Sequence, residues 1–207
     1  MLREFLNNSL KLGLYLSEEQ AQKLLDYLVL LRKWNKIHNL CAESSVQHML
    51  SYHVLDSISI AGVIDLKNKQ CLDVGTGAGL PGLLLAIAEP SCTMVLLDSK
   101  IKKITFVRQA IRLLELPNVV AVAERIERFA PQQQFDVIVS RAFSSLNDFI
   151  KLTTRLSNEQ GIIVAMKSDP ESFSVGSVIE KTIKILNIHQ VNVPGVVAKR
   201  SFIVCGK

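Results

Sequence analysis

The sequence predicts an α/β protein in which short apolar strands alternate with helices and build one sheet, preceded by a segment of helices alone. Residues up to about Ile64 show helical periodicity, whereas β-rich runs recur from about Gln70 onward. Strands that are apolar throughout, with helices between them, are typical of a parallel sheet covered on both faces. A length of 207 residues suits one such domain with a small addition. We therefore expect an N-terminal helical extension over residues 1–64 and a sheet domain over residues 65–207.

The extension carries clear helix signals. Ser17 and Gln20 form the pattern of a capping box, which predicts that a helix begins there. The apolar residues that follow recur on one helical face, at Ala21, Leu24, Leu25, Leu28, Leu31 and Trp34. We expect Trp34 in the core, with stacking on a nucleic-acid base as the alternative. A further apolar helix is expected over residues 52–64, and a turn over residues 67–69 leads into the sheet domain.

In the sheet domain, turn and helix signals separate short apolar runs at regular intervals. We expect strands at residues 71–74, 94–97, 119–122, 135–139, 162–166, 183–193 and 202–205. Between the first five strands, helices are expected from Pro81, Lys100, Arg125 and Leu146. Because Pro194 and Gly195 form a turn between the last two runs, that pair is expected to be antiparallel. The sheet should therefore have about seven strands, mostly parallel, with an antiparallel last strand.

Composition and charge narrow the function classes. A chain with 48% hydrophobic and 21% charged residues is globular, which excludes disordered and low-complexity proteins. Its apolar runs are much shorter than the ~20 residues of a membrane span, and its polar N-terminus argues against secretion. The four cysteines lie far apart and lack metal-binding spacing, so we expect a cytoplasmic protein without a metal. A net charge of +5 permits a partner that carries phosphate.

The most informative stretch is residues 71–82, which read Cys-Leu-Asp-Val-Gly-Thr-Gly-Ala-Gly-Leu-Pro-Gly. A strand runs here into a glycine-rich turn and then into a helix, whose first turn accommodates Pro81. Glycines at alternate positions let the backbone approach a ligand because no Cβ intervenes. The helix N-terminus also presents free N–H groups to an anion. A tight turn without a ligand is the alternative interpretation.

The spacing around this turn favours an adenosine ligand. The turn satisfies the pattern G-x-G-x-x-G, and Asp98 follows Gly79 by 19 residues, at the end of the next expected strand. An acidic residue at that place accepts hydrogen bonds from ribose hydroxyls. Asp73 would repel the pyrophosphate of a dinucleotide, whereas it suits the ammonium and sulfonium groups of S-adenosylmethionine. The residues therefore favour S-adenosylmethionine over NAD.

Two later loops are expected to complete the pocket. Residues 124–127 follow the third strand, where polar groups and backbone amides can read an adenine edge. Residues 140–144 follow the fourth strand, at the carboxyl edge where open α/β sheets bind ligands. The alternatives are surface charges at a helix start for Glu124 and Glu127, and a solvated loop arginine for Arg141.

Together these motifs resemble the RsmG family, formerly called glucose-inhibited division protein B. The resemblance rests on the glycine loop at residues 72–82, on the Asp98 turn with Lys103 beyond it, and on Ser140-Arg141-Ala142-Phe143. Further similar segments are Trp34-Asn35-Lys36 with Asn39-Leu40, His53-Val-Leu-Asp56-Ser57, and Met166-Lys167. The resemblance extends from about residue 20 to Arg200.

This resemblance implies a class I, Rossmann-like methyltransferase that uses S-adenosylmethionine to methylate N7 of a guanine in bacterial 16S ribosomal RNA. It implies cofactor contacts at Gly75, Leu80, Ile126, Glu127 and Arg141, with Asp98 on the ribose. The residue pattern adds Asp73, Gly77 and Gly79 to the cofactor loop. The chain departs from the family pattern at Cys41, at Tyr52, where an arginine commonly precedes the histidine, and at Ser168.

The expected chemistry needs no general base. Guanine N7 has a free lone pair at neutral pH, so catalysis rests on proximity and orientation. We expect Arg141 or Lys167 to position the guanine through O6 or a phosphate. His53 and Asp56 lie three residues apart on one helix face and are expected to bond each other or cap a neighbouring element.

The RNA is expected to contact the helix after Asp98 and the C-terminal region. The nominated phosphate-binding residues are Lys100, Lys102, Lys103, Arg108, Arg112, Lys199 and Arg200. A solvated helix face is the alternative, and Tyr52 is a candidate for stacking on a base. The partner is thus expected to be 16S ribosomal RNA or the small ribosomal subunit. Two other function classes stay open, a nicotinamide-dependent oxidoreductase and a noncatalytic RNA- or ribosome-binding module.

Overall fold

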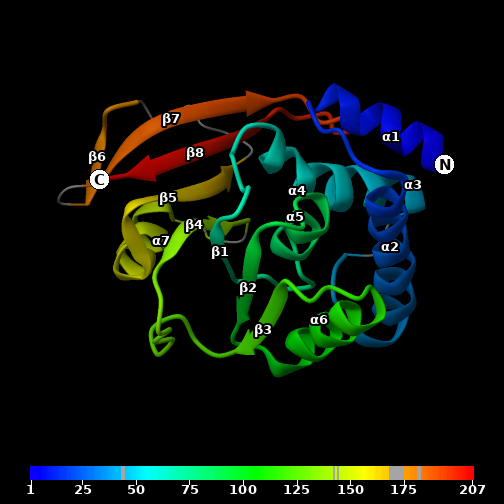
Figure 1. Cartoon of the computed structure of the whole chain (residues 1–207), viewed down its shortest axis with the longest axis horizontal. Coiled ribbons are helices and arrows are strands. Elements are labelled where there is room, and N and C mark those ends of the chain that lie inside the picture. The colour runs from blue at the N-terminus through cyan, green and yellow to red at the C-terminus, as the bar shows by residue number, and fades with distance from the viewer. Residues whose placement is uncertain (43–44, 142, 144, 168–174, 181–182) are drawn as a thin grey trace.

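One sheet organises the chain, as the computed structural model shows for residues 1–42, 45–141, 143, 145–167, 175–180 and 183–207 (Figure 1). Its strands are β1 (Gln70–Val74), β2 (Thr93–Asp98), β3 (Val119–Ala123), β4 (Phe135–Ser140), β5 (Ser157–Lys167), β6 (Val178–Glu180), β7 (Ile183–Val191) and β8 (Arg200–Gly206). They lie in the order β3-β2-β1-β4-β5-β8-β7-β6. The order of the strands reverses at β1, which lies between β2 and β4. Because these three strands are parallel, their carboxyl ends share one edge of the sheet.

Strand direction agrees with the sequence prediction. The strands β1 to β5 pair in parallel, whereas β8 runs antiparallel to both β5 and β7. The seven predicted strands and the antiparallel last strand are therefore confirmed. The eighth strand, β6, was not predicted, because three residues paired antiparallel with β7 at the sheet edge leave little pattern in the sequence.

Helices precede the sheet and connect its strands. They are α1 (Leu2–Lys11), α2 (Glu18–His38), α3 (Val46–Met49), α4 (Asp56–Ile58), α5 (Gly82–Ala88), α6 (Ile101–Leu113) and α7 (Leu146–Thr153), with a π-helical turn η1 (Leu50–Leu55) and 3₁₀ turns η2 (Ser59–Gly62) and η3 (Thr154–Leu156). The predicted capping box begins α2: the Ser17 hydroxyl accepts from the Gln20 N–H, and the Gln20 carbonyl oxygen accepts from the Ser17 N–H. No helix in the described part is both long and apolar enough to cross a membrane.

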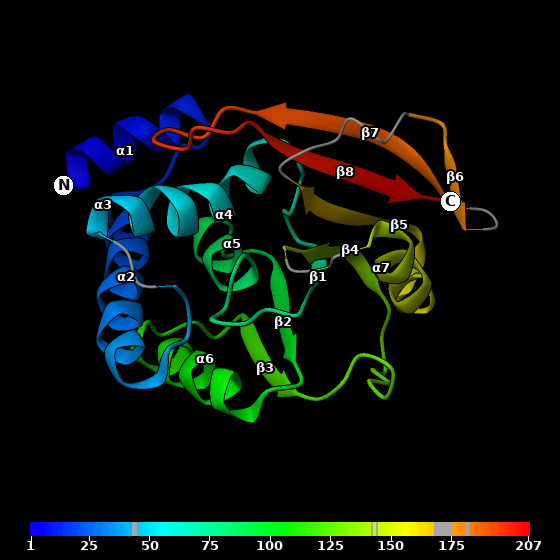
Figure 2. The same cartoon turned by 180° about the vertical axis from the view of Figure 1, so that it is seen from behind.

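The helices cover both faces of the sheet (Figures 1 and 2). On one face α1, α2, α4, α5 and α6 pack in a single apolar cluster that includes Cys71 of β1. On the other face α7 and η3 pack against Leu72, the next residue of the same strand. Because successive side chains of a strand point to opposite faces, both faces of β1 are buried. The helical extension thus shares a core with α5 and α6, and its boundary at residue 64 stays a prediction.

One predicted helix is wrong. The segment from Arg125 forms a single turn, in which Phe129 N–H bonds to the carbonyl of Arg125, and no helix is assigned there. Arg155 of η3 donates to the carbonyl oxygens of Ile126 and Phe129. A continued helix would need those carbonyl groups for its own hydrogen bonds. The turn therefore ends at Phe129, whose side chain joins the core beneath it.

Candidate functional site

The glycine-rich turn lies between β1 and α5, at the carboxyl edge of the parallel strands. Gly75, Gly77 and Gly79 have φ angles of +73°, +61° and +90°, in the region that glycine enters without steric cost. The N–H groups of Gly75 and Thr76 both donate to the carbonyl of Leu97, at distances of 2.8 and 3.0 Å. The turn is therefore fastened to the end of β2. Leu80, a predicted cofactor contact, is buried in the same turn.

Asp73 holds this turn from inside the protein. Its side chain is completely buried, and its Oδ2 accepts from the Thr76 hydroxyl at 2.6 Å and from the Gly82 N–H at 2.8 Å. Burial raises the pKa of Asp73 to about 6. A Cβ on Gly82 would lie 2.6 Å from the Asp73 Cβ, so only glycine fits there. Asp73 thus orients the loop, and its direct contact with a cofactor stays a prediction.

Asp98 ends β2 beside the turn. Its Oδ2 accepts from the Gly77 N–H and its Oδ1 from the Lys100 N–H, both at 2.9 Å. A carboxylate with two oxygens has acceptor sites left over for further donors. Asp98 also lines a cavity of about 300 Å³, which we call the cofactor cavity. Its position fits the predicted contact with ribose hydroxyls.

The cofactor cavity brings together part of the predicted site. Gly75, Asp98, Ile126 and Glu127 all line it. Apolar groups of Val74, Leu97, Ile126 and Phe143 surround these polar ones, which is the usual make-up of a small-molecule site. Its apolar wall, its three carboxylates (Asp98, Glu124 and Glu127) and the glycine turn fit the adenosine and cationic groups of S-adenosylmethionine. Gly77, Gly79, Leu80, Asp73 and Arg141 are not among its described lining residues.

Tyr27 supports the turn from the helical extension, and the sequence analysis missed it. This tyrosine of α2 is fully buried, and its hydroxyl donates to the carbonyl of Ala78 in the turn at 2.7 Å. Burial raises the pKa of Tyr27 well above its ordinary value. The signal was its place on the apolar stripe of α2, between Leu24 and Leu31. A hydroxyl on that stripe needs a buried partner.

A second cavity of about 440 Å³ adjoins the first, and we call it the base cavity. Its lining includes Arg141 from the end of β4 and Lys167 from the end of β5, the two residues predicted to position a guanine. Phe143 lines both cavities. The Lys167 Nζ donates to the carbonyl of Phe143 at 2.7 Å. The structure therefore places the two predicted positioning residues next to the cofactor cavity. Ser168 lies outside the described residues.

Two arginines enclose a buried carboxylate at the base cavity. Asp56 lies 2.7 Å from Arg200 Nε and 3.4 Å from an Arg141 guanidinium nitrogen. The same Arg141 nitrogen donates to the carbonyl of Tyr52 at 3.0 Å. Burial raises the pKa of Asp56, and the charges of Arg200 and Arg141 oppose that shift. This ion pair holds both guanidinium groups in place.

The predicted bond between His53 and Asp56 is wrong. Asp56 pairs with the arginines, and neither ring nitrogen of His53 has a hydrogen-bond partner within the described structure. Burial, followed by the charge of Arg141, lowers the pKa of His53 to about 4. The imidazole is therefore neutral at pH 7. A charged histidine beside Arg141 would add repulsion, so the neutral form is favoured, and Asp56 pairs instead with the oppositely charged arginines.

The nominated RNA-binding residues differ in exposure and in local contacts. Those that are exposed, as phosphate contact requires, are Lys100, Lys102, Arg108, Arg112 and Lys199. Lys103 is half-buried and lines the cofactor cavity, while Arg108 donates twice to the carbonyl of Ala121, at 3.2 and 3.3 Å. Arg200 is held by Asp56. Contact of all these residues with RNA stays a prediction, but the structure gives three of them local roles.

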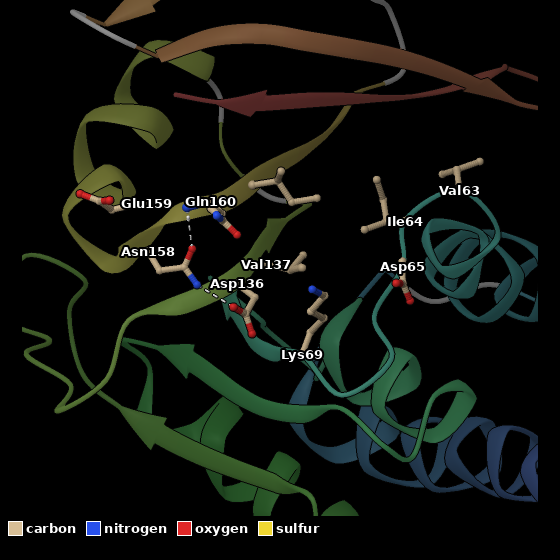
Figure 3. Close-up of a pocket in the computed structure, with 10 residues that line it drawn as sticks. Val63, Ile64, Asp65, Lys69, Asp136, Val137, Asn158, Glu159 and Gln160 are labelled. Carbon is tan, nitrogen blue, oxygen red and sulfur yellow. Dashed lines mark hydrogen bonds between the residues drawn. The ribbon is translucent and has the colours of Figure 1, made fainter.

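A larger cavity, of about 600 Å³, lies at the opposite edge of the sheet (Figure 3). Its polar groups already form hydrogen bonds between strands of the sheet. Asp136 accepts from the Gln70 N–H at 2.7 Å and from the Asn158 amide at 2.6 Å. Ligands of open α/β sheets bind at the carboxyl ends of the strands, not at this amino edge. In the described part of the chain, no three His, Cys, Asp or Glu residues gather as metal ligands.

Solved structures show the same fold. A methyltransferase from Aquifex aeolicus, described as dependent on S-adenosylmethionine, superposes with a TM-score of 0.57 at 16% identity, over 76% of this chain and 92% of that one. TrmN from Thermus thermophilus gives a TM-score of 0.55 at 18% identity, over 74% of this chain and 48% of that one. At such identities the likeness concerns the fold alone, and it confirms the predicted Rossmann-like methyltransferase sheet.

Sequence comparisons identify the family. A family model described as rRNA small subunit methyltransferase G matches residues 20–203. Proteins named ribosomal RNA small subunit methyltransferase G from Methylobacillus flagellatus and Chromobacterium violaceum are each 42% identical over 93% of this chain, and over 92% and 91% of their own lengths. These matches confirm the resemblance, the enzyme class and the cofactor inferred from the sequence. The chain therefore belongs to the rRNA small subunit methyltransferase G family of S-adenosylmethionine-dependent enzymes.

Proposed function

We propose that this protein transfers the methyl group of S-adenosylmethionine to N7 of a guanine in 16S ribosomal RNA. The observation that carries the proposal is the pair of adjoining cavities, which share Phe143 at the carboxyl end of β4. One cavity has the glycine turn and carboxylates that suit the cofactor. The other has Arg141 and Lys167, which suit an acceptor-rich base. A methyl donor and its acceptor must meet at such a junction.

The cofactor is assigned to the first cavity. There Asp98 binds the ribose hydroxyls, Ile126 and Phe143 cover the adenine, and the turn from Gly75 to Gly79 supports the rest of the molecule. S-adenosylmethionine supplies a methyl group bonded to a positively charged sulfur. Asp73 keeps the turn in shape, and Tyr27 ties it to the helical extension.

The guanine is assigned to the base cavity. Arg141 is held by Asp56 and by the Tyr52 carbonyl, so its guanidinium plane has a defined orientation. Guanine O6 lies next to N7 and accepts hydrogen bonds from cationic side chains. Arg141 or Lys167 donates to O6 or to a phosphate and leaves the N7 lone pair free. Holding the two reactants in line contributes up to roughly 7–11 kcal/mol without a general base.

Two alternatives are less consistent with the site. A nicotinamide-dependent oxidoreductase needs room for a pyrophosphate near the turn, and Asp73 places a carboxylate beneath it. A noncatalytic RNA-binding module does not need a cofactor cavity that opens beside a base cavity. The proposed partner, ribosomal RNA or the small ribosomal subunit, also implies that the protein works in the bacterial cytoplasm.

A tritium-transfer assay tests the proposal. Labelled S-adenosylmethionine is incubated with small ribosomal subunits or with naked 16S ribosomal RNA, and with wild type, Arg141→Ala or Lys167→Ala. We expect a loss of turnover of about 100-fold in at least one variant, because misplaced reactants lose orientation. Lys151→Ala, which removes an exposed lysine on α7, is the matched control. Full activity in both Arg141→Ala and Lys167→Ala, with cofactor binding intact, would refute the assigned positioning.

A further inference from the structure

Two aromatic rings stack on each other at the base cavity. The imidazole of His48 and the ring of Tyr52 lie one helical turn apart, with centroids 4.0 Å apart and planes inclined by only 6°. Both residues line the base cavity. His48 is exposed, whereas Tyr52 is half-buried. The stack therefore extends from the wall of the cavity to its solvent-facing rim.

A cation and a loop complete this arrangement. The guanidinium carbon of Arg200 lies 5.8 Å from the centroid of the Tyr52 ring, and Asp56 holds that arginine in place. The Tyr52 hydroxyl accepts from the Val197 N–H at 3.4 Å. Val197 is 96% exposed on the loop between β7 and β8. The ring of Tyr52 is thus held by residues 197–200, and His48 presents a flat surface beside it.

We propose that His48 and Tyr52 form a stacking platform for an unpaired RNA base next to the target guanine. The inference rests on the proposed function, since it assumes that a guanine enters the base cavity. A base inside a helix is covered by its neighbours, so an enzyme that reacts with it must unstack it. Aromatic side chains, histidine included, replace the lost stacking in RNA recognition. His48 lies at the exposed rim of the base cavity, within reach of a nucleotide next to the one that enters it.

The cation near the Tyr52 ring comes from Arg200 on β8, and position 52 supplies an aromatic surface. Stacking tolerates any base because every base has a π face. The platform should therefore add affinity for the RNA without adding sequence specificity.

Methyl-transfer kinetics on small ribosomal subunits test the platform. His48→Ala should lower kcat/KM for the subunit by about 5- to 150-fold, the range expected for one stacked base, mainly through KM. His48→Phe keeps a flat ring and should restore most of the loss. The KM for S-adenosylmethionine should not change, because neither ring lines the cofactor cavity. Gln47→Ala removes an exposed neighbour on the same helix and serves as the control.

Salt dependence separates stacking from phosphate contact. His48→Ala should leave the slope of log KM against log salt unchanged, whereas loss of one phosphate contact reduces that slope by about 0.7–0.9. An unchanged KM in His48→Ala, or a loss that His48→Phe does not restore, would overturn the platform. If the platform is overturned but the wild-type protein still methylates guanine N7 in the same assay, the proposed function stands. Absence of that methylation would instead refute the proposed function.

Discussion

Replacing Gly82 with alanine tests the contact between Asp73 and the glycine turn. The new Cβ would lie 2.5 Å from Leu96 Cδ2 and 2.6 Å from Asp73 Cβ, so α5 or the turn must move. Overpacking of this kind costs about 1–3 kcal/mol. The displacement also weakens the hydrogen bond from the Gly82 N–H to the Asp73 carboxylate, and a hydrogen bond to a charged group contributes about 1.5–3 kcal/mol. Alanine recovers about 1 kcal/mol through its higher helix propensity. We expect a net loss of about 2 kcal/mol or more in the free energy of unfolding.

Denaturant unfolding and calorimetric titration with S-adenosylmethionine measure the two effects of Gly82→Ala. The Kd should rise about tenfold if ~1.4 kcal/mol of the strain falls on the turn. Gly13→Ala is the control, because Gly13 also has a positive φ, +76°, but a Cβ there meets nothing within 4 Å. That variant should lose about 1 kcal/mol of stability and bind the cofactor normally. A Gly82→Ala protein that binds S-adenosylmethionine as tightly as wild type would refute the role given to Asp73.

Three further predictions concern Tyr27, Asp73 and Arg108. Tyr27→Phe leaves the Ala78 carbonyl without its donor, so the free energy of unfolding in denaturant should fall by about 1–3 kcal/mol; no change would mean that the hydroxyl contributes nothing. Burial raises the pKa of Asp73 from 3.8 to about 6, so the folded protein binds this proton more tightly than the unfolded chain does. The stability from this group is present below about pH 4 and is lost as the pH rises through 6. Wild type should therefore lose stability relative to Asp73→Asn over that range, and parallel pH profiles would contradict the shift. Arg108→Ala removes two hydrogen bonds to Ala121 and should lower the melting temperature; an unchanged melting temperature would contradict this local role, and a reduced salt slope of RNA binding would show the nominated phosphate contact.

The glycine turn and the sheet were predictable because their signals are local. A strand that leads into alternating glycines, with Asp98 ending the next strand, specifies a turn at the carboxyl edge of a parallel sheet. The structure confirms those elements and the hairpin at the C-terminus. The antiparallel last strand was predicted from the Pro194-Gly195 turn between the last two apolar runs, whereas the order of the strands in the sheet was not predicted.

Contacts between distant residues limited the prediction elsewhere. The segment after Arg125 has helix-like composition, but Arg155, from a different element, takes the carbonyl groups of Ile126 and Phe129. The spacing of His53 and Asp56 suggested a local bond, yet Arg141 and Arg200 arrive from β4 and β8 and carry full charges. A charged donor wins over a neutral imidazole for a buried carboxylate. Such partners are set by the fold as a whole.

The most direct test of the central claim is to identify the methylated atom. Small-subunit ribosomal RNA is treated with the protein and S-adenosylmethionine, digested to nucleosides and analysed by mass spectrometry against authentic methylguanosine standards. The adjoining cavities, with Arg141 and Lys167 beside the base and no general base required, predict 7-methylguanosine as the product. Methyl groups found on another base, or on another atom of guanine, would contradict the account.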